Sequence, residues 1–100
     1  MPMQPDNTIR LGGCALGGRP RVVVAVRAGV DRTEVEAALA SGADIIELRA
    51  DLFPGPTPET VAGECARFAG MPRLLTVRCA AEGGGWRGDE AGRLACILAG

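Results

Sequence analysis

The sequence contains no histidine, no lysine and no tyrosine, so all eleven of its basic residues are arginine. Histidine is the commonest general base and the commonest metal ligand. The side chain that most often fills these two roles is therefore missing from the chain. Lysine is the side chain that forms Schiff bases with ketones. No side chain of this polypeptide can therefore form an imine with a substrate.

Aromatic residues are also scarce, with only Phe53, Phe68 and Trp86 in one hundred residues. This scarcity weighs against an all-β sandwich and against base stacking. The net charge of −1 gives no reason to expect an anionic partner. No apolar run approaches membrane-spanning length. We therefore expect neither a nucleic-acid partner nor a membrane partner.

The four cysteines are widely spaced and form no C-x-x-C pair; they are Cys14, Cys65, Cys79 and Cys96. Without histidine, a zinc site would need all four to converge. No secretory leader precedes them, which disfavours a disulfide scaffold. We expect reduced, mostly buried thiols in a cytoplasmic protein, with no metal site and no cofactor.

Hydrophobic patterns and helix signals divide the chain into alternating strands and helices. Residues 1–7 read as a flexible tail, and residues 8–16 read as a short hairpin around Gly12 and Gly13. Helices are expected from Asp31 or Thr33 to about 41, from Thr57 to about 70, and over about 89–99. Strands are expected at 21–27, 43–49 and 73–78, and the first is apolar on both faces, as in a strand covered on both sides.

The order β-α-β-α-β-α predicts parallel strands joined by right-handed helical crossovers. Each βα unit is about 25–30 residues long, as in a TIM barrel. We therefore predict an α/β fold, in which residues 8–100 form a hairpin followed by the first three βα units of a TIM (β/α)8 barrel. Three strands alone would leave bare edges and one poorly covered face, which indicates a fragment or one piece of an assembly.

Charged residues appear late in the second and third strands. Glu47 and Arg49 alternate along one face of strand 43–49, and Arg78 ends strand 73–78. Ligands of parallel α/β folds bind at the carboxyl ends of the strands, so these side chains are expected to meet at one mouth. A carboxylate and two guanidinium groups suit a small, oxygen-rich substrate. A purely structural salt-bridge cluster is the alternative, and Asp51 is expected to serve a cap or turn.

These residues resemble a known family. E-L-R-A-D at 47–51 and L-L-T-V-R-C-A-A-E-G-G at 74–84, after the start P-R-V-V-V-A-V at 20–26, are similar to type I 3-dehydroquinate dehydratase. The resemblance covers about residues 8–100. It implies a (β/α)8 barrel that dehydrates 3-dehydroquinate to 3-dehydroshikimate through a lysine imine, in the shikimate pathway of aromatic amino acid biosynthesis. It also implies a homodimer when the full-length chain exists.

Carried over by motif, Glu47, Arg49 and Arg78 would bind the substrate, and Glu82 would orient the catalytic histidine. The first strand has Ala25 where the family usually presents a serine to the substrate, and Ala81 replaces a basic residue. The catalytic histidine and lysine belong to later strands that this chain does not contain. The resemblance therefore implies that the isolated chain is inactive.

Three alternatives stay open. Gly83-x-Gly85-x-x-Gly88 matches the dinucleotide-binding pattern, although that pattern normally follows the first strand of its unit. Read otherwise, this stretch is a mobile active-site loop or a plain linker. Another sugar-phosphate TIM-barrel enzyme could share the G-A-D-I-I-E segment at 42–47. The chain could also be a non-enzymatic remnant or an assembly module.

Overall fold

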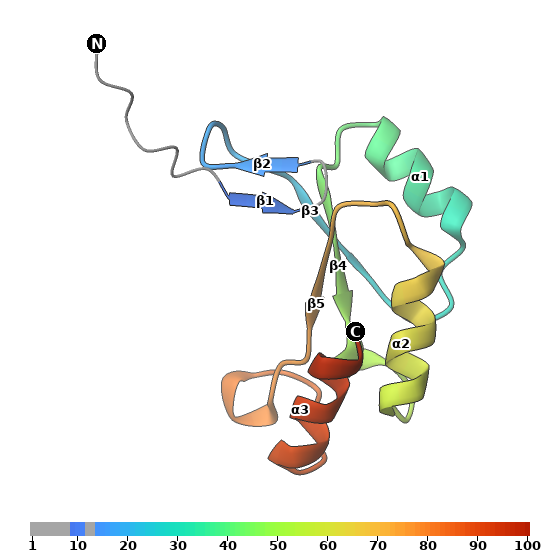
Figure 1. Ribbon diagram of the computed structural model, residues 1–100, viewed down its shortest axis with the longest axis vertical. Coiled ribbons are helices and arrows are strands. Elements are labelled where there is room, and N and C mark those ends of the chain that lie inside the picture. Colours follow the sequence, from blue (N-terminus) through green and yellow to red (C-terminus); the bar gives the residue numbers. More distant parts are fainter. Residues whose placement is uncertain (1–8, 12–13) are drawn as a thin grey trace.

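The computed structural model describes residues 9–11 and 14–100 (Figure 1). The predicted tail at 1–7 and the turn of the predicted hairpin, Gly12 and Gly13, lie outside these residues. Strands β1 (Ile9–Leu11) and β2 (Cys14–Leu16) pair antiparallel, as the sequence predicted. Figure 1 places this hairpin near the amino-terminal ends of a second, larger sheet.

The larger sheet contains three parallel strands in sequential order, which are β3 (Val23–Val26), β4 (Ile45–Arg49) and β5 (Arg73–Thr76). The register pairs Ala25 with Glu47, and Arg49 with Thr76. β3 and β5 are shorter than predicted because Arg21, Arg27 and Arg78 lie outside the paired segments. At the amino-terminal end, the Asp44 carboxylate accepts a hydrogen bond from the Val22 N–H at 2.8 Å, which ties β3 to β4.

Each helix begins at a residue that can accept a backbone hydrogen bond. Asp31, rather than Thr33, caps α1 (Arg32–Ala40), and Asp89 caps α3 (Glu90–Ala99). Thr57 caps α2 (Pro58–Arg67) through a capping box with Thr60. Two short 3₁₀ turns, η1 (Ala50–Leu52) and η2 (Ala80–Glu82), follow β4 and β5; the sequence patterns did not predict them.

The hydrophobic core lies between one face of the sheet and the helices. Ile46 and Leu48 of β4 are fully buried, and they share a cluster with Val35 of α1, Val61 of α2 and Cys96 of α3. All three helices therefore pack on the same face, as expected when sequential strands are joined by crossovers of one hand. This single winding is the arrangement that a barrel repeats.

The opposite face of the sheet is largely open, as expected for three strands alone. The apolar pattern of the first strand had predicted cover on both sides, and that prediction is wrong for these residues. Val23 is 48% exposed, Leu74 is 42% exposed, and Ala25 is also exposed. Ile45 is the exception on this face, because it is buried yet lies outside the main cluster. We call this surface the open face.

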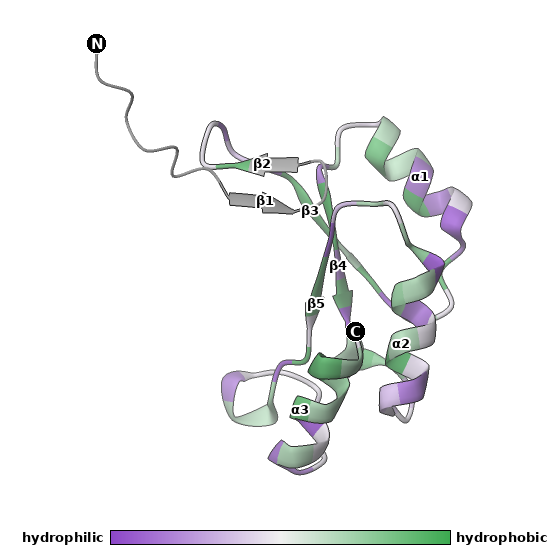
Figure 2. Cartoon of the chain, viewed as in Figure 1, coloured by the Kyte–Doolittle hydropathy of each residue, from purple (hydrophilic) through white to green (hydrophobic). Residues whose placement is uncertain are grey.

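Apolar side chains are also exposed on α3. Leu94, Ile97 and Leu98 are spaced i, i+3, i+4, and Leu98 is 86% exposed. The carboxyl-terminal turns of α3 are coloured hydrophobic in Figure 2. Such a stripe on a helix is normally covered in a folded protein.

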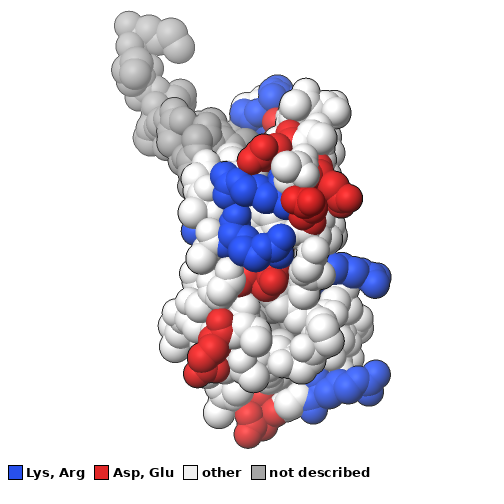
Figure 3. All heavy atoms as spheres, turned by 90° about the vertical axis from the view of Figure 1, so that its right-hand side faces the viewer, with Lys and Arg blue, Asp and Glu red and all other residues white. Residues whose placement is uncertain are grey.

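The remaining surface features are modest. Acidic and basic side chains are interspersed on the face that Figure 3 shows. Among the described residues, no helix is both long and apolar enough to span a bilayer.

Cys65 and Cys96 are buried free thiols, Cys79 is a half-buried one, and Cys14 lies among residues whose side chains are not described. Burial raises the pKa of the Cys65 and Cys96 thiols, so both are poor nucleophiles.

Candidate functional site at the carboxyl ends of the strands

The open face changes from apolar to polar along the strands. Its first row contains Val23 and Ile45, and its second row places Glu47 beside Ala25 on one side and Leu74 on the other. Residues paired in register on parallel strands point to the same face. The third row pairs Arg49 with Thr76. The polar groups therefore gather at the carboxyl ends of the strands, where parallel folds place their ligands.

Glu47 is held by the neighbouring strand. Thr76 donates a hydrogen bond from its Oγ1 to Oε2 of Glu47 at 2.9 Å. Glu47 is half-buried, and its second carboxylate oxygen accepts no hydrogen bond from the described residues. This carboxylate is fixed in position and can still accept a hydroxyl proton from a ligand.

Arg49 is paired with Asp51 in a two-pronged ion pair. Nε donates to Oδ1 of Asp51 at 3.0 Å, and one terminal nitrogen donates to Oδ2 at 2.7 Å. The hydrogen bonds from Arg49 to Asp51 raise the pKa of Arg49, and the charge of nearby Glu47 raises it further. This geometry fixes the guanidinium plane and leaves the other terminal nitrogen available for a ligand.

Asp51 is the only charged residue that is buried among the described residues, at 4% exposure. Burial raises its pKa, but hydrogen bonds from Arg49 and from the backbone N–H groups of Gly85 and Arg78 outweigh burial and lower the pKa to about 2. The carboxylate therefore stays ionised and joins the end of β4 to the loop after β5. Asp51 was expected to serve a cap or turn; it lies in the turn η1, but its side chain pairs with Arg49 and the Gly85 N–H instead of capping a helix.

The glycine-rich loop after β5 is tied to both strands. The Gly85 N–H donates to Oδ2 of Asp51 at 2.8 Å, and the Trp86 N–H donates to the Arg78 carbonyl at 3.2 Å. A Cβ on Gly84 would lie 2.1 Å from the Arg78 carbonyl oxygen, and a Cβ on Gly85 would lie 2.6 Å from that of Asp51. Close backbone packing thus accounts for these glycines without a bound nucleotide.

We expect Gly84→Ala to destabilise the chain by about 1–3 kcal/mol, because the new methyl group overlaps backbone atoms that cannot move aside cheaply. Gly63→Ala is the matched control, since nothing lies within 4 Å of its Cβ position in α2. Alanine favours helices over glycine by about 1 kcal/mol, so the control should gain stability. Urea unfolding followed by circular dichroism measures both, and equal effects would contradict the packing explanation.

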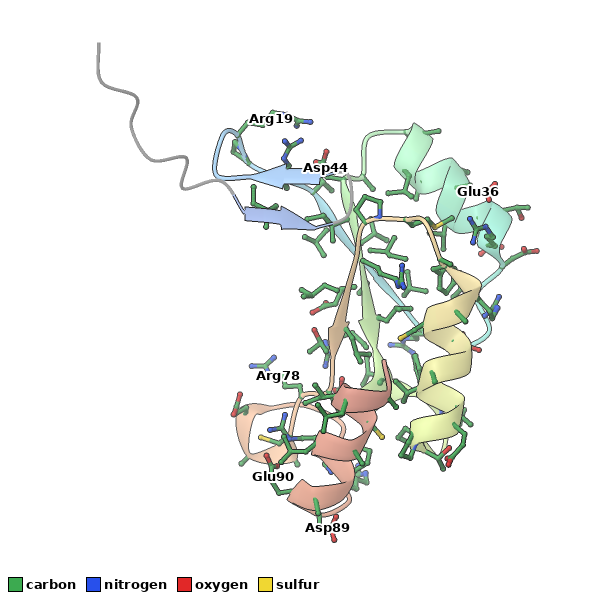
Figure 4. All side chains as sticks on the ribbon, viewed as in Figure 1. Arg19, Glu36, Asp44, Arg78, Asp89 and Glu90 are labelled. Carbon is green, nitrogen blue, oxygen red and sulfur yellow. The ribbon has the colours of Figure 1, made fainter. Side chains whose placement is uncertain are left out.

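Arg78 and Glu82 lie beyond the end of β5. Both are exposed, and Figure 4 shows Arg78 extending away from α2. The Arg78 guanidinium lies 3.9 Å from the Cβ position of Gly83, so it covers the turn that follows Glu82. Within the described residues, neither side chain has a hydrogen-bond or ion-pair partner. Both can therefore donate to or accept from a ligand or a further part of the protein, although the charge of Glu82 also acts on Arg93.

The structure thus groups Glu47 and Arg49 closely, sets Ala25 beside Glu47, and places Arg78 at the adjacent strand end. Thr76 fixes Glu47 through a hydrogen bond, but no site role was assigned to it from the sequence. Its position two residues before Arg78, on the same face of the strand, was the signal that could have identified it. Across the described residues, no cluster of three or more metal-binding side chains occurs.

Comparison with known proteins gives one consistent result. A family model described as type I 3-dehydroquinase matches residues 22–100. The 3-dehydroquinate dehydratase of Methanosarcina acetivorans is 43% identical over 61 residues, which are 58% of this chain and 25% of that protein. Its counterpart from Methanococcoides burtonii is 30% identical over 92 residues, which are 89% of this chain and 39% of that protein. The chain spans between a quarter and two fifths of the length of these relatives.

Proposed function

The chain belongs to the type I 3-dehydroquinase family, and we propose that it supplies the first three βα units, and half of the substrate pocket, of an enzyme that dehydrates 3-dehydroquinate. The observation that carries this proposal is the polar end of the open face. There Glu47 is held by Thr76, Arg49 is held by Asp51, and Arg78 is unpaired. The proposed barrel would turn this face inward.

The chemistry of the substrate suits these groups. 3-Dehydroquinate carries ring hydroxyls and a carboxylate, which need hydrogen-bond acceptors and cationic donors respectively. Glu47 would accept hydroxyl protons, while Arg49 and Arg78 would donate to substrate oxygens. Ala25 stands beside Glu47 but offers no hydroxyl, so one contact usual in the family is absent.

The covalent steps would come from residues outside this chain. In the proposed reaction, a lysine forms an imine with the substrate ketone and a histidine moves protons as water leaves. Glu82, exposed at the end of η2, would accept a hydrogen bond from that histidine and fix its tautomer. The protein would be a cytoplasmic homodimer in its full-length form.

Barrel closure would also cover the exposed apolar surface. Val23 and Leu74 on the open face would join the barrel interior, and the stripe Leu94, Ile97 and Leu98 would pack against later units. Closure would also pair the bare edges of β3 and β5. The same surface favours a second candidate, in which the chain is a non-enzymatic assembly module that covers these residues with another subunit.

A chimera tests the proposed function. Residues 22–100 replace the matching segment of the Methanosarcina acetivorans 3-dehydroquinate dehydratase, so that the rest of that protein supplies the later units. We expect measurable dehydration of 3-dehydroquinate. Glu47→Gln should lower kcat/KM by about 10–100-fold, because a hydrogen bond to a charged group is worth about 1.5–3 kcal/mol.

Glu36→Gln provides the matched control in that chimera. Glu36 lies on the exposed side of α1, and within the described part of the chain its only ion-pair partner is Arg32, four residues earlier. Its loss should leave kcat/KM unchanged. A folded chimera without activity, or equal effects of the two substitutions, would favour the assembly module over the enzyme.

A further inference from the structure

A pocket of about 580 Å³ lies between the two loops that follow β4 and β5. We call it the loop pocket. Its walls come from residues 51–53, 55–56 and 85–88, and its main apolar side chains are Leu52, Phe53, Pro56 and Trp86. The volume is in the range typical of small-molecule sites. None of the residues assigned above to the substrate, Ala25, Glu47, Arg49 and Arg78, lines it.

Both walls of the pocket belong to this chain. One wall follows β4 and the other follows β5, and the two are joined by the hydrogen bond between Gly85 and Asp51. The two walls are therefore held together within residues 51–88.

The aromatic wall is fixed in place. Trp86 donates from Nε1 to the Asp89 carbonyl at 2.9 Å, so its ring cannot turn freely. A Cβ on Gly88 would lie 2.8 Å from the Trp86 ring, and a Cβ on Gly92 would lie 3.2 Å from it. Phe53 is 6% exposed, whereas Leu52 is 41% exposed. A flat apolar ligand could cover both Leu52 and the indole.

Two charged residues line the loop pocket, Asp51 and Arg87, and only Arg87 has no ion-pair partner among the described residues. Asp51 is its one acidic residue, and the ion pair with Arg49 neutralises that carboxylate. The carboxylate of nearby Asp89 accepts a hydrogen bond from the Gly92 N–H at 2.8 Å. Arg87 is exposed and has no hydrogen-bond or ion-pair partner in the described part of the chain. An unpaired guanidinium beside apolar walls selects an anion with an apolar body.

We propose that the loop pocket binds a small carboxylate that carries a flat apolar ring, with the ring on Trp86 and Leu52 and the carboxylate on Arg87. No residue assigned to the substrate lines this site, although Asp51, which lines it, also holds Arg49. The proposal does not depend on whether the chain belongs to an active enzyme. Arginine binds carboxylates through two parallel hydrogen bonds, which gives the selectivity for a charged over a neutral ligand.

Phenylacetate, phenylacetamide and acetate are suitable probes, because they separate the ring from the charge. Trp86 is the only tryptophan, so its fluorescence reports binding. We expect saturable binding of phenylacetate, at least tenfold weaker binding of phenylacetamide, and no measurable binding of acetate. Equal affinity for phenylacetate and phenylacetamide, or no saturation by phenylacetate at 10 mM (about 2.7 kcal/mol of binding at most), would overturn the proposal.

Two variants locate the site. Arg87→Ala should remove the preference for phenylacetate over phenylacetamide, whereas Leu52→Ala should weaken both by about threefold or more. Arg27→Ala is the matched control, because Arg27 is another exposed arginine without a partner in the described chain and does not line the pocket. An equal loss in Arg27→Ala would show nonspecific charge binding and contradict the assignment.

Circular dichroism of each variant confirms that the fold is retained. If the isolated chain or a variant does not unfold cooperatively, the same probes are titrated calorimetrically into the chimera and its Arg87→Ala variant. The result with the chimera then decides whether the loop pocket binds the carboxylate, because residues 22–100 contain both loops. Loss of activity in the chimera would count against the proposed function alone and not against the loop pocket.

Discussion

Purified alone, the 100-residue chain is expected to leave 3-dehydroquinate unconverted. Enzymes typically accelerate their reactions by about 10⁶-fold or more, and the proposed imine mechanism depends on a lysine that this sequence lacks. The rate of product formation, followed by the ultraviolet absorbance of the conjugated ketone, should match the uncatalysed rate. Borohydride treatment with the substrate should trap no adduct on any side chain.

Adding the later units of the proposed barrel in trans is the complementary experiment. The carboxyl-terminal part of the Methanosarcina acetivorans relative, starting after the matched segment, should bind the open face and restore activity. Expression in a host that lacks its own 3-dehydroquinate dehydratase excludes contamination. Turnover by the isolated chain, confirmed in such a host, would contradict the proposed division of the catalytic groups.

The strand and helix order could be predicted because each element carries its own local signal. β4 alternates apolar and charged residues, Thr57 precedes a proline, and Asp89 precedes the last helix. The open face was expected from the number of strands, but the residues of β3 themselves did not predict it. An apolar strand looks the same whether its second face is covered by its own chain or by residues from elsewhere.

The polar site shows the same division between local and tertiary information. Alternation along β4 placed Glu47 and Arg49 on one face, and the structure agrees. The contact of Asp51 with Gly85 spans 34 residues, and no local pattern encodes it. The glycine-rich loop was compatible with a nucleotide site on sequence alone. The close approach of Gly84 to Arg78 arises from the tertiary fold of the loop, which no local pattern encodes.

Asp51→Asn is expected to destabilise the chain by about 3 kcal/mol at neutral pH. Removing one partner of a buried ion pair costs about 3–5 kcal/mol, and the lower end applies because Arg49 keeps 20% of its side chain exposed and can be hydrated. The substitution also weakens the bond between Asp51 and the Gly85 N–H. Urea unfolding of both proteins at pH 7 measures the difference.

The pH dependence gives an independent check on the same group. The pKa of Asp51 falls from 3.8 to about 2 on folding, and one pKa unit corresponds to about 1.4 kcal/mol. A lowered pKa means that folding favours the ionised carboxylate, so its contribution of about 2–3 kcal/mol is present above pH 4. This contribution should disappear as the pH falls from about 4 to 2.

The difference in stability between the unmodified chain and Asp51→Asn should therefore shrink across that pH range. Glu36→Gln is the control, because its exposed pair with Arg32 on α1 is worth at most about 0.5 kcal/mol and has no backbone donor among its contacts. A constant difference between pH 7 and 2 would mean that Asp51 stabilises the chain through shape rather than charge. In that case Arg49 would not be held by an ionised partner, and its assignment as a pre-positioned substrate contact would lose its physical basis.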